Sequence, residues 1–477
     1  MGEEIQTSQF DEQDQARFHA ALLKETDTLR RYFETGRFEQ SGGIAGFELE
    51  AWLIDSLQRP VSGNEEFLRL FDSPLASPEL ASFNIEVNGT PRHLSGHAFS
   101  AMHNELNETW RRCQQTAARL DARVVMCGIL PTVQNDDLNL ANMSKMERYR
   151  ALNREVVRMR QGKPIVLDIN GQEHLKLTHR DVMLESAATS FQIHLQMHPA
   201  ESVRLFNASL ALSAPLVALS ANSPYLFGKD LWDETRIPLF EQSVAVGGFA
   251  GAKFGPIRRV GFGSGYVRHS LMECFTENLQ HYPILLPVDL SSEPQKFAHL
   301  RLHNGTIWRW NRPLVGFDEA GQVHMRLEQR VVPAGPTVID EIANAAFYYG
   351  AVAELAGQAL PIESQLEFDR ARDNFYNAAR LGLRSVCSWA QEKPIPMREL
   401  ILKQLLPMAA SGLDKLGIAH DDRDQYLGII CERVESGANG AHWQRAWVEK
   451  HGRDMAALTA AYVERQQTGE PVHDWTV

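Results

Sequence analysis

Residues 46–55 read Gly-Phe-Glu-Leu-Glu-Ala-Trp-Leu-Ile-Asp, and the alternation in this segment is the strongest constraint on the fold. In a β-strand, successive side chains point to opposite faces, so Phe47 and Leu49 face one way and Glu48 and Glu50 face the other. Two carboxylates held side by side repel each other or share a proton unless a cation lies between them. The segment therefore predicts a strand whose acidic face either binds a cation or is solvated at the surface.

The overall composition limits the class of protein. A chain of 477 residues with 44% hydrophobic and 23% charged residues is typical of a globular protein with a large core, in one or two domains. The net charge of −12 argues against a nucleic-acid backbone as the main partner. No apolar run approaches the roughly 20 residues of a membrane helix, so we expect no membrane partner.

The cysteines and the N-terminus indicate the compartment. The five cysteines are far apart and include no Cys-x-x-Cys pair, a pattern typical of reduced thiols. The N-terminus is acidic and polar, unlike a secretory signal. We therefore expect a cytoplasmic protein.

The pattern along the chain predicts an α+β portion followed by a helical portion. Helices are expected at 10–37, 64–72, 97–120, 199–221 and 232–244, and strands at 46–55, 83–88, 123–127, 189–196, 299–303, 308–312 and 324–332. From about 337 to 468 the chain is rich in Ala, Leu, Glu and Arg and predicts five or six helices. The expected division is an N-terminal helix at 1–40, an α+β domain at 41–335 and a helical region at 336–477.

Several predicted strands repeat the pattern of one polar and one apolar face. The polar positions on these faces are Glu86, Gln192, His194, Gln196, Arg326, Glu328 and Arg330. A histidine in such a position is more often structural than a ligand, and alternating charges also occur as a ladder on an exposed sheet. The pattern alone is therefore compatible with a lined cleft or with an ordinary surface.

Two connecting segments carry further signals. Ser144 and Glu147 have the spacing of a capping box at a helix start. Residues 247–265 are rich in glycine and contain Lys253, Arg258 and Arg259, but they lack the Gly-Lys-Ser/Thr of a P-loop. This segment could be a lid over phosphates or a long surface loop.

If the acidic side chains of these strands point into one concavity, their negative charge must be compensated by a positive group. Mg²⁺ or Mn²⁺ supplies it, because these ions take carboxylate oxygens and keep sites open for water and phosphate. Zinc is disfavoured by the absence of Cys ligands and of a His-Glu-x-x-His spacing. A carboxylate-rich cup with arginines suits an enzyme that grips the β- and γ-phosphates of ATP.

Six short motifs occur in one order along the chain: Gly-Phe-Glu-Leu-Glu at 46–50, Ile-Glu-Val at 85–87, Met-Ser-Lys-Met-Glu-Arg-Tyr at 143–149, Phe-Gln-Ile-His-Leu at 191–195, Ala-Asn-Ser-Pro at 221–224 and Arg-Leu-Glu-Gln-Arg at 326–330. In these motifs, across about residues 44–350, the chain resembles the type-2 glutamate–cysteine ligase family, which includes plant-type enzymes and YbdK-like carboxylate–amine ligases. The resemblance implies a glutamine-synthetase-like fold, in which a curved antiparallel sheet flanked by helices holds ATP and Mg²⁺ or Mn²⁺ on its concave face.

The resemblance also implies a reaction. ATP would phosphorylate a glutamate-like carboxylate to an acyl phosphate, and an amine such as that of cysteine would attack it to form a γ-glutamyl amide, a step of glutathione biosynthesis. A homo-oligomer is compatible with this function.

The resemblance assigns roles by position. The implied metal ligands are Glu48, Glu50, Glu86, Glu328 and His194, although plant-type members have Asn at the position of His194. Arg330 is implied to act on the γ-phosphate and, with Glu328, to be catalytic. The residues implied to contact nucleotide or substrate are Gln192, Lys145, Arg148 and Arg236.

Residues 304–313 depart from the plant enzymes, and Trp308 is expected to line a different acid or amine pocket. Three alternatives remain open from the sequence: a guanidino-kinase-like phosphotransferase, a non-catalytic protein that kept the fold, and a metal-dependent amide hydrolase.

Overall fold

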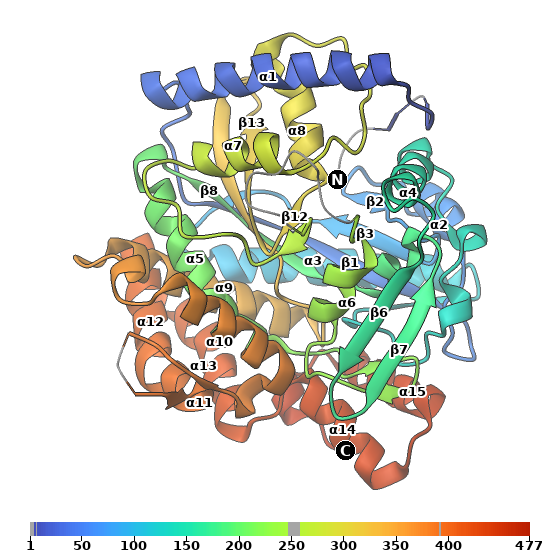
Figure 1. The fold of residues 1–477 in the computed structure, drawn as a ribbon. Helices are drawn as coiled ribbons and strands as arrows, with labels where there is room; N and C mark the ends of the chain where they lie inside the picture. The colour runs from blue at the N-terminus through green and yellow to red at the C-terminus, as the bar shows by residue number, and fades with distance from the viewer. Residues whose placement is uncertain (1–3, 6, 247–257, 391–392) are drawn as a thin grey trace.

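The computed structural model describes residues 4–5, 7–246, 258–390 and 393–477. Its centre is an eight-stranded antiparallel sheet (Figure 1). Six strands follow one another across the sheet, in the order β13 (Asn311–Phe317), β14 (Val323–Gln329), β8 (Phe191–Met197), β1 (Ile44–Ile54), β3 (Asn84–Asn88) and β2 (Ala76–Pro78). The two short strands β4 (Arg92–His93) and β5 (Arg123–Val125) pair with β1. The acidic segment of the sequence is therefore the central strand of the sheet.

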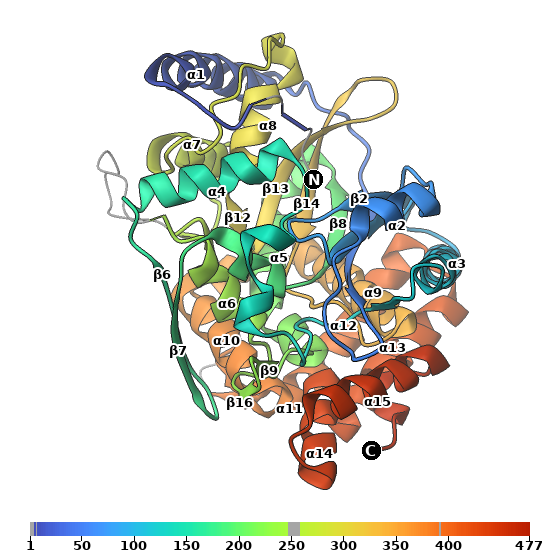
Figure 2. The ribbon, with the colours of Figure 1, turned by 90° about the vertical axis from the view of Figure 1, so that its right-hand side faces the viewer.

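Helices cover both sides of this sheet. Figure 2 shows α3 (Ala98–Ala118), α9 (Val338–Gly357), α12 (Leu406–Leu416) and α13 (His420–Ser436) on one side, and α4 (Glu147–Met159), α6 (Arg236–Ser243) and the hairpin β6 (Ile165–Asn170)–β7 (His174–His179) on the other. The apolar face of the sheet packs on the first group. Tyr349 of α9 donates its hydroxyl proton to backbone carbonyls of β1 and β8, at Gly46 (3.1 Å) and His194 (2.8 Å).

Helix α5 (Ser202–Ser220) is one of the most apolar helices of the core. With the three preceding residues it is long and hydrophobic enough to cross a membrane, but 89% of its apolar window is buried inside the fold. It contacts α9, α10 (Phe368–Leu381) and the strands β13 and β14. Its composition is therefore explained by its position under the sheet.

The remaining elements enclose the sheet at its ends. Helix α1 (Glu12–Thr35) packs on α7 (Met272–His281) and α8 (Ala298–Gly305), at the top of Figure 1. The other helices are α2 (Asn64–Phe71), α11 (Met397–Leu400), α14 (Gly440–His451) and α15 (Met455–Thr468), and the other strands are β9 (Tyr225–Leu226), β10 (Lys229–Asp230), β11 (Val260–Gly261), β12 (Trp308–Arg309), β15 (Val386–Cys387) and β16 (Ile395–Pro396). One hydrophobic core includes α1, the sheet and the C-terminal helices. The three-part division of the chain stays a prediction.

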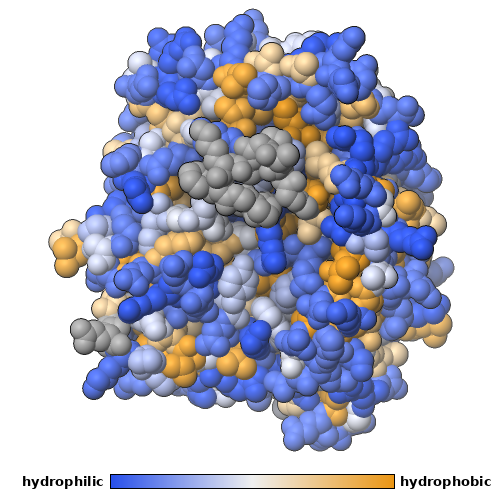
Figure 3. Space-filling model, in the orientation of Figure 1, coloured by the Kyte–Doolittle hydropathy of each residue, from blue (hydrophilic) through white to orange (hydrophobic). Residues whose placement is uncertain are grey.

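The surface agrees with the composition. In Figure 3 hydrophilic residues predominate, and the hydrophobic ones lie in separate areas. All five cysteines are free, and four of them are buried.

The curved antiparallel α+β fold is confirmed, and two local predictions are wrong. Residues 299–303 belong to helix α8 and not to a strand, because the Glu25 carboxylate of α1 accepts hydrogen bonds from Leu300 N (2.8 Å) and pairs with His299 Nδ1 (2.7 Å) at the start of the helix. The capping box is absent because α4 begins at Glu147 without a side-chain cap. Ser144 instead donates to a backbone carbonyl and accepts from Asn64 Nδ2.

Two further predictions concern the glycine-rich segment and the number of C-terminal helices. Residues 247–257 of the glycine-rich segment, with Lys253, lie outside the described residues. The C-terminal region contains α9 to α15, more helices than expected, because the π-helical segment Ile401–Leu405 divides one continuous helical stretch into α11 and α12.

Helices α9 and α12 approach so closely that a glycine is required in each. A Cβ atom at Gly412 would overlap the carbonyl oxygen of Gly350. We therefore predict that Gly412→Ala lowers the free energy of unfolding by about 2–4 kcal/mol. Gly428→Ala is the matched control, because its Cβ meets nothing within 4 Å, and it should be neutral or stabilising by up to about 1 kcal/mol. Urea denaturation measures both, and equal stability of the two variants would contradict this account.

Candidate active site

The register of the sheet brings the predicted polar positions together. Glu50 of β1 lies opposite Glu86 of β3, and Glu48 lies opposite Gln192 of β8. His194, two residues further along β8, lies opposite Glu328 of β14. Side chains from four strands thus share one face and form a polar cup, which is the arrangement that the alternation predicts.

Glu48, His194 and Glu328 form the first cluster of this cup. One ligand atom from each lies within 4.8 Å of the others. His194 Nε2 is 3.5 Å from Glu48 Oε1 and 3.9 Å from Glu328 Oε1, and this buried nitrogen has no hydrogen-bond partner among the described residues. Burial, reinforced by Arg326, holds the pKa of His194 well below its usual value, so the imidazole is neutral. A neutral imidazole facing two carboxylates has the donor chemistry of a metal ligand.

Two arginines neutralise Glu328. Arg312 donates from Nε to Oε2 (2.5 Å) and from Nη2 to Oε1 (2.9 Å), and Arg330 donates from Nη1 to Oε1 (2.9 Å). Burial alone would raise the pKa of Glu328, but these two guanidinium groups hold it well below its usual range. Arg312 was not among the predicted site residues. Its position opposite Glu328 follows from the pairing of β13 with β14.

Glu50, Glu79 and Glu86 form the second cluster, again with ligand atoms within 4.8 Å of one another. Burial and the neighbouring carboxylates Glu86 and Glu50 raise the pKa of Glu79 well above its usual value, and no described residue forms a hydrogen bond with its Oε1. Sequence reasoning missed Glu79 because it follows the short strand β2 and takes part in no alternation. Its nearest signal is the motif Ile-Glu-Val at 85–87, with which β2 pairs.

The residues that are present fit a divalent cation. Burial, followed by repulsion from Glu86 and Glu328, raises the pKa of Glu48 to about 7. The pKa of Glu50 is also raised, mainly by burial. These raised pKa values, together with the unpartnered His194 Nε2 and Glu79 Oε1, show that the side chains of the described residues leave the charge of the cup unbalanced. Mg²⁺ or Mn²⁺ would supply the missing charge through oxygen ligands.

Gln192 and Arg330 connect the two clusters. The Gln192 amide donates from Nε2 to Glu50 Oε1 (2.9 Å), and Gln192 Oε1 accepts from Arg330 Nη1. Ser190 N donates to the second Glu50 oxygen (2.7 Å). Gln192 therefore fixes Glu50 and Arg330 relative to each other.

A small pocket adjoins the second cluster, and its volume of about 250 Å³ includes space that is open to solvent. Its lining consists of Glu50, Glu185, Ala188, Ser190, Arg236, Phe240, Trp310 and Arg330. Arg236 is buried, in contrast to the exposed position that is usual for a helix arginine. It donates to Glu234 Oε1 (3.2 Å) and to the carbonyls of Val331 (3.2 Å) and Arg330 (3.1 Å), and its Nε has no partner within the described ranges.

The aromatic wall of this pocket corrects one prediction. Trp310 lines the pocket, whereas Trp308 is not among the described lining residues and packs on Phe240, with ring centroids 6.1 Å apart. Trp310 Nε1 donates to Glu241 Oε1 (3.0 Å), which also accepts from Tyr376 OH of α10 (2.7 Å). The reason is a break in the chain direction: Trp308 belongs to β12, whereas Trp310 lies between β12 and β13, so the alternation of a single strand does not relate the two side chains.

The structure does not bring Lys145 into the cup. Lys145 is exposed in the segment before α4, and its Nζ pairs with Glu65 Oε2 of α2 (2.9 Å). Arg148 lies at the β2 edge of the cup, where it donates from Nη2 to Tyr149 OH (2.7 Å) and to the carbonyl of Pro78 (3.4 Å).

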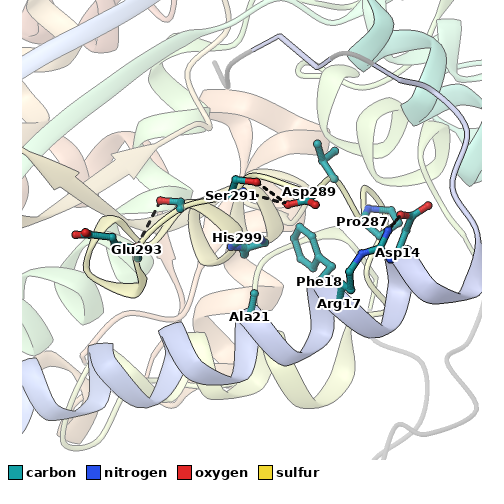
Figure 4. A pocket seen from close by; sticks show the side chains of 11 residues that line it. Asp14, Arg17, Phe18, Ala21, Pro287, Asp289, Ser291, Glu293 and His299 are labelled. Atoms are coloured by element: carbon teal, nitrogen blue, oxygen red, sulfur yellow. Dashed lines mark hydrogen bonds and ion pairs between the residues drawn. The ribbon is translucent and has the colours of Figure 1, made fainter.

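A larger cavity lies elsewhere. It encloses about 750 Å³, including its part open to solvent, between α1 and the segment 287–293 (Figure 4). Phe18, Arg17 and His299 contribute to its wall, and none of the cup residues does. It is therefore separate from the candidate active site.

Comparison with known proteins agrees with this geometry. The sequence model of the glutamate–cysteine ligase family 2 matches residues 44–469. The fold is similar to that of the glutamate–cysteine ligase from Francisella tularensis in complex with AMP, with a TM-score of 0.54, 11% identity, and coverage of 92% of this chain and 96% of that one. It is also similar to a bifunctional glutathione synthetase from Pasteurella multocida, with a TM-score of 0.50, 11% identity, and coverage of 93% of this chain and 55% of that one.

These two likenesses establish the fold, and no curated protein sequence matches the chain. The match to the family model covers most of the chain, including every strand of the cup. The chain therefore belongs to the glutamate–cysteine ligase family 2 and is an ATP-dependent carboxylate–amine ligase, which forms a carbon–nitrogen bond.

Proposed function

We propose that the cup joins a glutamate-like acid to an amino-acid amine such as cysteine through an acyl-phosphate intermediate. One observation carries this proposal. The carboxylate clusters adjoin a pocket in which two buried guanidinium nitrogens, Nε of Arg236 and Nε of Arg330, have no hydrogen-bond partner in the part of the chain that the structure describes. Unpartnered cationic donors beside a metal-binding cup fit an anionic group that transfers between substrates.

The residues that would hold Mg²⁺ or Mn²⁺ are Glu48, His194 and Glu328 in the first cluster and Glu50, Glu79 and Glu86 in the second. When bound, such ions neutralise phosphate oxygens and leave phosphorus open to attack. Glu86 is fixed for this role by hydrogen bonds from Ser77 Oγ (2.9 Å) and Asn88 Nδ2 (3.1 Å).

In this proposal the ligation proceeds in two steps, phosphorylation of the acid and attack by the amine. A carboxylate oxygen of the acid attacks the γ-phosphorus of ATP, ADP leaves, and an acyl phosphate forms. The amine nitrogen then attacks the acyl carbon, inorganic phosphate leaves, and the nitrogen loses a proton to give the amide. Arg330, held by Glu328 and Gln192, and Arg236, held by Glu234, bind the phosphoryl oxygens in both steps.

This function predicts phosphate release from ATP and Mg²⁺ only when an acid and an amine are both present. A matrix of amino acids and amines, with L-glutamate and L-cysteine included, tests it by phosphate assay and mass spectrometry of the product. A stable phosphorylated product without an amide would indicate a guanidino-kinase-like phosphotransferase, and amide cleavage without ATP would indicate a hydrolase. Either result overturns the proposal.

Two glutamates of the first cluster should respond differently to neutralisation. Glu48→Gln removes a carboxylate whose pKa is already raised, so turnover should fall by about 100-fold or more while stability is kept or increased. Glu328→Gln leaves Arg312 and Arg330 buried without their partner, and should cost about 3–5 kcal/mol of stability as well as activity. Turnover and urea denaturation separate the two effects. Normal turnover of Glu48→Gln would show that Glu48 holds no metal.

The raised pKa of Glu48 predicts a pH dependence of the metal-free protein. The folded state binds a proton at Glu48 up to about pH 7, whereas the unfolded chain releases it near pH 4.5. This contribution to stability is therefore complete below about pH 4.5 and is lost as the pH rises through about 7. The melting temperature in EDTA should fall between about pH 5 and pH 8, and Mg²⁺ should restore more of it at the higher pH.

Glu48→Gln is the control for this dependence, because it should flatten the profile in EDTA. An equal effect of Mg²⁺ at both ends of the pH range would contradict binding to these carboxylates.

A further inference from the structure

Four charged side chains line the pocket beside the second cluster, and three of them have partners in the protein. Glu50 accepts hydrogen bonds from Ser190 N and Gln192 Nε2. Arg236 pairs with Glu234, and Arg330 pairs with Glu328. Among the described residues, the fourth, Glu185, has neither a hydrogen bond from its carboxylate nor an ion pair. This half-buried side chain is therefore the charge that the protein leaves for a ligand.

Glu185 is held in place by its backbone. It belongs to the 3-10 helix Val182–Ala187, which is capped by the Asp181 carboxylate accepting from Met183 N (3.0 Å). Ser186 Oγ donates to the carbonyl of Met183 within the same turn (2.7 Å). This turn packs against α6, which contributes Phe240 to the lining of the same pocket. A carboxylate on a capped turn and an aromatic ring on the adjoining helix therefore line one pocket.

The electrostatic environment of Glu185 calls for a cation. Burial, followed by repulsion from Glu50, raises the pKa of Glu185 to about 8, even though Arg330 acts in the opposite direction. A positive group placed beside the carboxylate would remove this penalty.

The aromatic wall of the pocket indicates the chemistry of the rest of the ligand that carries the positive group. Phe240 and Trp310 contribute aromatic rings 5.8 Å apart, at an interplanar angle of 75°. Trp310 is fixed by its hydrogen bond to Glu241, which also binds Tyr376 of α10. Aromatic faces attract ammonium groups and pack against apolar side chains.

We propose that Glu185 binds the ammonium group of the amine substrate, and that the pocket takes a primary amine whose small apolar body contacts Phe240 and Trp310. This inference rests on the proposed function, because it assigns the pocket to the second of its two substrates. It makes Glu185 a determinant of amine specificity that takes no part in phosphorylation of the acid.

Hydroxylamine separates the two half-reactions. It is mostly uncharged near neutral pH, and it converts an acyl phosphate to a hydroxamate without needing an ammonium site. The full-length protein and Glu185→Gln are assayed with ATP, Mg²⁺ and L-glutamate, with either hydroxylamine or L-cysteine as the nucleophile. For Glu185→Gln, we expect the KM for cysteine to rise by about tenfold or more, with the KM values for glutamate and hydroxylamine within about twofold of those of the unmodified protein.

Each other outcome overturns the inference. Equal KM values for cysteine show that Glu185 does not bind the amine. Equal losses with cysteine and hydroxylamine, or a raised KM for glutamate, assign Glu185 to the acid or to the metal. If the unmodified protein forms neither the hydroxamate nor the amide, the proposed function fails and the inference fails with it.

Two further variants complete the experiment. Glu201→Gln removes an exposed carboxylate at the start of α5, with no ion pair among the described residues, and should leave all the KM values unchanged. If Glu185→Gln does not fold, Glu185→Asp decides the question. The aspartate keeps the charge but withdraws it from the pocket, so a raised KM for cysteine alone supports the inference, and any other result overturns it.

Discussion

The structure depends on how the protein compensates carboxylates that are buried side by side on one sheet. It uses two different solutions. Glu328 is balanced inside the protein, because Arg312 and Arg330 together satisfy both of its oxygens. Glu48 and Glu79 receive no guanidinium partner among the described residues, and burial raises their pKa values instead. The first solution gives a rigid framework, and the second leaves carboxylates whose charge a divalent cation would neutralise.

Packing on the opposite, apolar face of the sheet offsets the cost of burying these carboxylates side by side. Leu49, Ile193 and Leu327 lie on the buried apolar face of the strands that carry the acidic residues. Tyr349 of α9 joins the backbones of β1 and β8 behind the first cluster. The free energy gained by this apolar packing offsets the cost of holding like charges together. A surface sheet without such backing would relax and separate them.

The sequence predicted the site residues whose direction is set by the two-residue alternation of a β-strand. It did not predict the residues whose position is set by tertiary contacts. Alternation placed Glu48, Glu50, Glu86, His194 and Glu328 on the polar faces of their strands, and the sheet register then brought them together. Glu79 and Glu185 lie in a connection and in a 3-10 turn, where no period exists to mark them. Lys145 belongs to a motif shared with the family, but its backbone directs it to Glu65 on the surface. Helix α8 was mistaken for a strand because its apolar positions also alternate, and the deciding contact comes from Glu25, far away in the chain.

A chain of hydrogen bonds explains how the C-terminal helices can act on the pocket without lining it. Tyr462 of α15 accepts from Asn222 Nδ2 (2.8 Å), and Asn222 N donates to Glu234 Oε2 (2.9 Å). The other Glu234 oxygen accepts from Arg236 Nη1 (3.2 Å), so the path ends at the pocket. Tyr376 of α10 reaches Trp310 in the same way through Glu241. The helical region thus orients both a cationic and an aromatic wall of the pocket, and the Asn222 motif contributes by fixing Glu234 and, through it, Arg236.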